Sequence, residues 1–177
     1  MSEILKNKGR YMSLLLRHKP EKENLTLDEQ GYVLVDDLIE KLDITISDLK
    51  WIVNNNDKKR FAFNSDETMI RAAQGHSINV NLKMKQILPP DILYHGTTIT
   101  NSQEIAKSGL LKMGRNHVHL SDEKSTAYSV GLRYAKYINK IWIIEVDAKR
   151  MNADGYKFFK SENGVYLTDH VPSEYFL

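Results

Sequence analysis

The chain has 177 residues, of which 41 % are hydrophobic and 27 % charged, as in soluble globular proteins of one domain or two small ones. It contains no cysteine, which excludes disulfides and thiolate metal sites, and its formal net charge of +2 excludes binding of a large anion through the global field alone. The start of the chain lacks the apolar core of a signal peptide, and no apolar run is long enough to cross a membrane, so we expect a cytoplasmic protein.

The first half of the chain predicts a small helical unit with a hairpin. Apolar side chains recur at helical spacing over residues 3–18, and Pro20 predicts that this helix ends at Lys19. The following segments predict a short strand with a glycine turn over 25–33, a helix over 35–43, a helix over 46–57 with Ser47 as its N-cap, and a β-hairpin over 60–73. This order resembles a winged helix, a module that often binds nucleic acid and also serves in contacts between proteins.

Pro89 and Pro90 predict a linker, because proline interrupts both helices and strands. We therefore expect two lobes, residues 1–88 and 89–177. The second half predicts a strand over 91–99, a helix over 101–110 that stops at Gly109, a strand over 116–121, a helix over 123–138, a strand over 141–146, and further strands within 157–168 and 171–177. The expected class is α+β.

Arginine and histidine recur together along the chain. Arg17 adjoins His18 at the end of the first predicted helix, where both could also be no more than a basic last turn that favours the helix dipole. Further members of this pattern are Arg71 before the turn Gln74-Gly75-His76-Ser77, His95, Arg115 before His117-Val118-His119, and Arg133. Guanidinium groups hold phosphate through paired hydrogen bonds, and imidazole exchanges protons near neutral pH. The pattern therefore indicates phosphoryl chemistry.

Other nucleotide and metal chemistries have weaker signals. The chain lacks the P-loop motif and a G-x-G-x-x-G after a strand, which argues against a P-loop ATPase and a Rossmann dehydrogenase. His117 and His119 would face the same way on a strand, so together with His95 they form an alternative zinc-hydrolase hypothesis.

Seven motifs in order make the chain resemble the NAD-dependent RNA 2′-phosphotransferases, often called tRNA 2′-phosphotransferase or KptA. They are LLRHKP, LTLDEQGYVLVDDLI, IRAAQGHS, LYHGT, HVHLS, SVGLR and NGVYLT. The resemblance implies an N-terminal winged-helix lobe (1–88) that binds RNA and a C-terminal ADP-ribosyltransferase-like lobe (89–177) that binds NAD. It also implies a monomer that acts without a metal, and a link to tRNA splicing.

The implied reaction has two steps. The RNA 2′-phosphate displaces nicotinamide from NAD, and a ribose hydroxyl of the attached ADP-ribose then takes the phosphate. The products are nicotinamide, RNA with a free 2′-hydroxyl and ADP-ribose 1″,2″-cyclic phosphate.

The resemblance also assigns residues. The implied catalytic set is Arg17, His18, Arg71 and Arg133. The implied NAD-binding set is His95, Gly96, Thr97, His119 and Ser121, with Gly96 letting backbone approach the ligand. Contacts to RNA are expected from Gln74, His76, Ser77 and Arg115.

Two positions refine the hypothesis. Val165 occupies a position where enzymes that ADP-ribosylate proteins usually carry glutamate, which argues against protein modification. Tyr134-Ala135 follows Arg133 where the family often has His-Gly. The alternatives are an enzyme that caps terminal phosphates of nucleic acids with ADP-ribose, and a winged-helix binding protein without catalytic activity.

Overall fold

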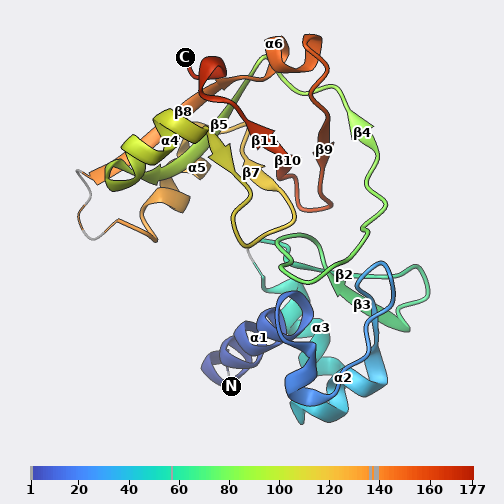
Figure 1. The fold of residues 1–177 in the computed structure, drawn as a ribbon. Helices are drawn as coiled ribbons and strands as arrows, with labels where there is room; N and C mark the ends of the chain where they lie inside the picture. The colour runs from blue at the N-terminus through green and yellow to red at the C-terminus, as the bar shows by residue number, and fades with distance from the viewer. Residues whose placement is uncertain (1, 57, 136, 138–139) are drawn as a thin grey trace. The chain divides into compact units, whose positions relative to one another are not determined.

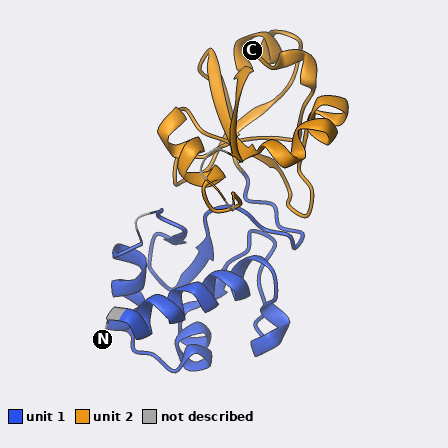
Figure 2. Ribbon diagram, turned by 90° about the vertical axis from the view of Figure 1, so that its left-hand side faces the viewer, with its two compact units in different colours: residues 1–83 blue, residues 84–177 orange. Residues whose placement is uncertain are grey.

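The computed structural model describes residues 2–56, 58–135, 137 and 140–177 of a mixed α+β protein (Figure 1). The chain forms two compact units, residues 1–83 and 84–177 (Figure 2), and each has its own hydrophobic core. The division precedes Pro89-Pro90 because the short strand β4 (Gln86–Ile87) pairs with β9 (Phe158–Lys160) of the second unit. Among the described residues, no helix has the length and apolar character needed to cross a membrane.

Three α-helices build most of the first unit: α1 (Ser2–Arg17), α2 (Val35–Leu42) and α3 (Ile46–Asn54). Helix α1 confirms the prediction, and Pro20 begins the short 3₁₀-helix η1 (Pro20–Glu23). The buried side chains of Met12, Leu15 and Leu16 place one face of α1 in the core. Burial of this face fixes the end of α1, where Arg17 and His18 lie.

A small antiparallel sheet completes the first unit, with the strand order β1 (Val33–Leu34), β3 (Met69–Ala72), β2 (Phe61–Phe63). Strands β2 and β3 confirm the predicted hairpin, with Phe61 opposite Ala72 and Ala62 opposite Arg71. Arg71 is therefore carried by the central strand, where pairing on both sides restricts the backbone.

Two local predictions for the first unit were wrong. The N-cap of α3 is Thr45 and not Ser47, because Thr45 and Asp48 exchange hydrogen bonds in a capping box. Of the short strand and glycine turn expected over 25–33, the turn is confirmed, since Gly31 has a φ of +79° and the Asp28 carboxylate accepts hydrogen bonds from the backbone N–H groups of Gln30 and Tyr32. The strand is displaced to β1. Residue 57, at the end of the predicted α3 helix, lies outside the described residues.

The second unit is built mainly of strands. Strand β5 (Ile92–Thr98) pairs along its whole length with β8 (Ile141–Asp147), and helix α5 (Lys124–Gly131) packs against β5. A four-stranded sheet has the order β4-β9-β10-β7, where β10 is Tyr166–Thr168 and β7 is Val118–Leu120. Strands β6 (Leu110–Leu111) and β11 (His170–Val171) form a further pair, and the remaining helices are α4 (Ser102–Ser108) and α6 (Ala148–Ala153).

The ends of some elements in the second unit differ from the prediction. Helix α4 stops before Gly109 as expected, but α5 ends at Gly131, and Arg133 lies in the turn that follows. Residues 136 and 138 of that predicted helix lie outside the described residues. The strand expected over 171–177 is largely the 3₁₀-helix η4 (Ser173–Tyr175), which begins directly after Pro172.

Candidate active site

The end of helix α1 is tied to the turn that follows strand β3. The backbone N–H of Ser77 donates to the carbonyl oxygen of Arg17 over 2.9 Å. The side chains are linked as well, because His18 Nδ1 and Ser77 Oγ lie 2.9 Å apart. These contacts bring two of the predicted motifs, LLRHKP and QGHS, to one place in the first unit.

Gly75 lies beside the Arg17 guanidinium in this turn. Its φ of +88° is in the left-handed region that favours glycine, and the position of a Cβ added there would be 3.8 Å from Arg17 Cζ. The Nε and Nη2 atoms of Arg17 are buried. The guanidinium is therefore held against backbone and does not extend freely into solvent.

His76 lies at the centre of this group. Its side chain is only 2 % exposed. The pKa of His76 is lowered to about 4, chiefly by burial and to a smaller extent by the nearby positive charges of Arg17, His18 and Arg71. His76 is thus a neutral imidazole at physiological pH, surrounded by cations. We call Arg17, His18, Arg71 and His76 the arginine–histidine cluster.

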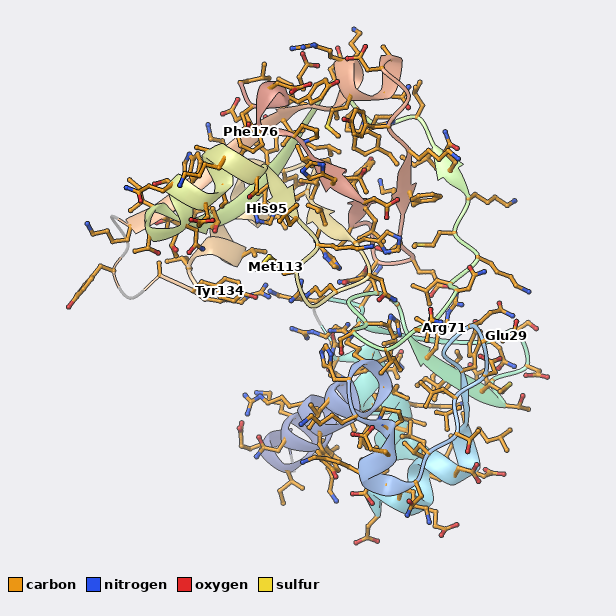
Figure 3. All side chains as sticks on the ribbon, in the orientation of Figure 1. Glu29, Arg71, His95, Met113, Tyr134 and Phe176 are labelled. Carbon is orange, nitrogen blue, oxygen red and sulfur yellow. The ribbon has the colours of Figure 1, made fainter. Side chains whose placement is uncertain are left out.

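Arg71 is held from a second direction by the turn that precedes β1 (Figure 3). Its Cζ lies 4.6 Å from the centroid of the Tyr32 ring, and its Nη1 donates to the carbonyl oxygen of Gln30 over 3.4 Å. Tyr32 and Gln30 were not among the residues predicted for the site. The only available signal was their place in the LTLDEQGYV motif, which gives no indication of a contact with Arg71.

A second group of predicted residues lies in the second unit, where β5 passes β7 (Figure 3). The Nδ1–H of His95 donates to the carbonyl oxygen of His119 over 2.9 Å. Backbone hydrogen bonds between Tyr94 and Ser121, of 2.7 and 2.9 Å, join the same strands. His95, His119 and Ser121 are thus brought together, and we call them the β5–β7 group.

The electrostatics of His95 differ from those of a surface histidine. Burial lowers its pKa, the hydrogen bond to the His119 carbonyl opposes that shift, and the charge of Arg115 adds to it. Because Nδ1 carries the proton and donates a hydrogen bond to that carbonyl, Nε2 of the neutral ring can only accept a hydrogen bond. The group therefore presents a neutral imidazole of defined orientation.

Gly96 and Thr97 are shaped by protein packing. A Cβ added at Gly96 would lie 1.7 Å from the carbonyl oxygen of Ala127 in α5, so only glycine fits there. The Thr97 side chain is buried, and its Oγ1 accepts a hydrogen bond from Asn101 over 3.2 Å. Close packing against α5 is therefore one reason for a glycine at 96, and close approach to a ligand stays a prediction.

The remaining predicted residues are more exposed. Arg115 lies in a turn and Arg133 in the turn after α5, and both are exposed. Val165 directly precedes β10. Of the four predicted catalytic residues, Arg17, His18 and Arg71 converge in the first unit, whereas Arg133 belongs to the second.

The zinc hypothesis lacks a supporting arrangement. Within the described ranges, no three His, Cys, Asp or Glu residues are grouped so that they could hold a metal ion. His117 contacts the ring of Phe159 instead, with centroids 6.1 Å apart.

Comparison with known proteins agrees with the resemblance seen in the motifs. The model of the family described as RNA 2'-phosphotransferase, Tpt1 / KptA family matches residues 5–170. A probable RNA 2'-phosphotransferase of Fusobacterium nucleatum is 50% identical over 173 residues, covering 94% of this chain and 94% of that protein. Proteins of the same description from Trichormus variabilis and Flavobacterium johnsoniae are each 48% identical, covering 94% and 97% of this chain and 92% and 95% of their own lengths.

Proposed function

Because the chain belongs to the RNA 2'-phosphotransferase, Tpt1 / KptA family of transferases, we propose that it removes an internal 2′-phosphate from RNA by transferring it to NAD. The observation that carries the proposal is the convergence of Arg17, His18 and Arg71 around the buried His76. Two guanidinium groups and an imidazole suit a phosphate dianion, whose charge they neutralise while an oxygen is exchanged.

In the first step, an oxygen of the RNA 2′-phosphate attacks C1″ of the nicotinamide ribose of NAD. The new C–O bond replaces the C–N bond, and nicotinamide leaves with the electron pair of that bond. In the second step, the 2″-hydroxyl of the transferred ADP-ribose loses its proton and attacks phosphorus. The P–O bond to the RNA breaks, and the RNA 2′-oxygen takes a proton to become a hydroxyl.

The arginine–histidine cluster supplies the phosphate side of this reaction. Arg17 and Arg71 bind the phosphate oxygens, and His18 exchanges the proton in the second step. The hydrogen bond between His18 Nδ1 and Ser77 fixes the orientation of the ring, so Nε2 is the nitrogen that we assign to proton transfer. By the resemblance, Arg133 of the second unit completes the catalytic set by stabilising the charge that develops on the transferred group.

The β5–β7 group supplies the NAD side. We assign His95, Thr97, His119 and Ser121 to the binding of NAD, with the backbone at Gly96 as a fifth contact. Support comes from the defined tautomer of His95, whose acceptor Nε2 suits a ribose hydroxyl.

Most of these roles divide between the two units. We propose that residues 1–83 are a winged-helix RNA-binding unit and that residues 84–177 are an ADP-ribosyltransferase-like NAD-binding unit. Three helices with a three-stranded antiparallel sheet support the first assignment. Gln74, Ser77 and Arg115 are assigned to RNA, whereas His76 is too buried for a direct contact and is assigned to the support of the cluster.

The test uses the purified protein, NAD and an RNA oligonucleotide with one internal 2′-phosphate. We expect nicotinamide, RNA with a 2′-hydroxyl and ADP-ribose 1″,2″-cyclic phosphate in equal amounts, identified by mass spectrometry. A stable ADP-ribosylated RNA end would instead assign the capping reaction, and unchanged RNA with bound oligonucleotide would assign a binding protein.

Two variants test the residue assignments. His18→Ala is expected to bind NAD normally and to release no dephosphorylated RNA, because the second step lacks its proton-transfer group. Arg133→Ala is expected to lower turnover by about 10²–10³-fold and to accumulate ADP-ribosylated RNA. Normal turnover by both variants would contradict the assignments.

A further inference from the structure

We infer that Tyr32, through the turn formed by residues 28–32, is a positioning residue that holds the Arg71 guanidinium in its phosphate-binding orientation. This inference rests on the proposed function, since it concerns the same phosphate. Nothing in the motif pattern assigns Tyr32 a role. The contact that carries the inference is the 4.6 Å approach of Arg71 Cζ to the centroid of the Tyr32 ring.

The turn itself is built to be rigid. One oxygen of Asp28 accepts from the N–H groups of Gln30 and Tyr32, both over 2.8 Å. The backbone closes the same turn, because the Asp28 N–H donates to the Tyr32 carbonyl over 2.9 Å and the Gly31 N–H donates to the Asp28 carbonyl over 3.0 Å. A turn with this many local bonds presents Gln30 and Tyr32 in one orientation.

Arg71 is held by this turn at two chemically different points. The negative face of the Tyr32 ring attracts the guanidinium, and the Gln30 carbonyl accepts from Nη1 over 3.4 Å. Arg71 is 8 % exposed, and its strand β3 is paired on both sides. The Tyr32 ring and the Gln30 carbonyl together restrict how the guanidinium can turn.

The same turn also contacts the rest of the cluster. Gly31 has a φ of +79°, and a Cβ added there would lie 3.5 Å from His76 Nε2. The turn therefore packs against the neutral imidazole as well as against Arg71. His76 adds no positive charge beside these cations, and Tyr32 offsets part of the charge of Arg71 without adding a carboxylate that would repel the phosphate.

An arginine that is already oriented loses little side-chain freedom when the phosphate arrives. Removal of the ring would leave Arg71 charged but with more rotamers, so the contribution of the 2′-phosphate to binding falls. The quantity to measure is the ratio of affinities for two RNA oligonucleotides of one sequence, one with an internal 2′-phosphate and one with a 2′-hydroxyl. Binding is measured without NAD, so that no turnover occurs.

We expect Tyr32→Leu to reduce this affinity ratio by about tenfold, and Tyr32→Phe to keep it within about twofold, because phenylalanine retains the π-face. Tyr11→Leu is the matched control, since Tyr11 is also a half-buried tyrosine of the first unit and bonds to Glu23 away from the turn. Pentafluorophenylalanine at position 32 keeps the shape of the ring and removes its negative face, so it reports on the interaction even where Tyr32→Leu lowers the folded fraction.

The inference requires that Tyr32 acts through Arg71. The double variant Tyr32→Leu, Arg71→Ala is therefore expected to have the same affinity ratio as Arg71→Ala alone. An unchanged ratio in Tyr32→Leu and in the fluorinated variant, an equal loss in Tyr11→Leu, or a further loss in the double variant would overturn the inference. The proposed function fails separately, namely if the wild-type protein with NAD leaves the 2′-phosphorylated RNA unconverted.

Discussion

The imidazole of His18 and the hydroxyl of Ser77 lie 2.9 Å apart although 59 positions separate them in the chain. The backbone of Ser77 is bonded to Arg17 at the same point, so the contact is fixed from both sides. A histidine that exchanges protons must present one particular nitrogen, and a bond to its other nitrogen is the usual means of orienting the ring. Ser77 therefore acts as the orienting partner of His18.

Loss of this partner is expected to slow the chemical step. Ser77→Ala removes one hydrogen bond and should reduce kcat about fivefold with little change in the KM for NAD, since a side-chain hydrogen bond contributes about 1 kcal/mol. Ser77→Thr keeps the hydroxyl and is the control. Steady-state kinetics on a 2′-phosphorylated RNA measures both, and equal losses in the two variants would show that the hydroxyl is not what matters.

Burial of His76 predicts acid sensitivity. The unfolded chain binds a proton at this residue near pH 6.5, whereas the folded chain does so only near pH 4, so stability from this residue is present above pH 6.5 and is lost as the pH falls toward 4. The loss is on the order of 3 kcal/mol. The surrounding Arg17 and Arg71 side chains stay charged throughout this range, so their repulsion of a protonated His76 persists.

Urea unfolding at several pH values measures this effect. The free energy of unfolding of the wild type should fall between pH 6.5 and 4. In His76→Asn this fall should be smaller by about the amount that protonation of His76 costs, because the variant has no imidazole to protonate. If the free energy of unfolding depends on pH in the same way in the wild type and the variant, folding does not lower the pKa of His76.

Gly96 is expected to matter first for folding. Gly96→Ala would place a Cβ 1.7 Å from the Ala127 carbonyl oxygen, a clash with backbone that forces α5 away from β5 and costs on the order of 3 kcal/mol. Gly114→Ala is the matched control, because a Cβ there would have no neighbour within 4 Å. The melting temperature should fall strongly in Gly96→Ala and hardly change in Gly114→Ala. Equal melting temperatures would mean that glycine is not required at position 96 for folding.

The start of helix α3 gives a prediction on stability alone. Thr45→Ala removes the oxygen that accepts from the Asp48 N–H and should cost about 1 kcal/mol. Ser47→Ala lies inside the helix and should change the free energy of unfolding by less than about 0.5 kcal/mol. A larger loss in the free energy of unfolding for Ser47→Ala than for Thr45→Ala would show that Ser47 is the N-cap, as expected from sequence.

Local sequence patterns determined most elements of this protein. Apolar spacing and Pro20 defined α1, alternation around residues 64–67 defined the β2–β3 hairpin, and Gly109 ended α4. These features depend on neighbours a few positions away, so the sequence carries them directly. The cap of α3 was missed because Thr45 and Ser47 are equally good caps by type, and only the bond with Asp48 distinguishes them.

The motifs also supplied the family and a set of candidate functional residues, but not the environments of those residues. That His76 is buried and neutral, that Tyr32 faces Arg71, and that Gly96 is required by α5 are results of contacts between distant segments. Desolvation and close packing depend on which segments meet in three dimensions, and no spacing in the chain encodes them. The sequence by itself thus determined which side chains are available for phosphate chemistry, while only the tertiary structure decided which of them are charged, held or enclosed.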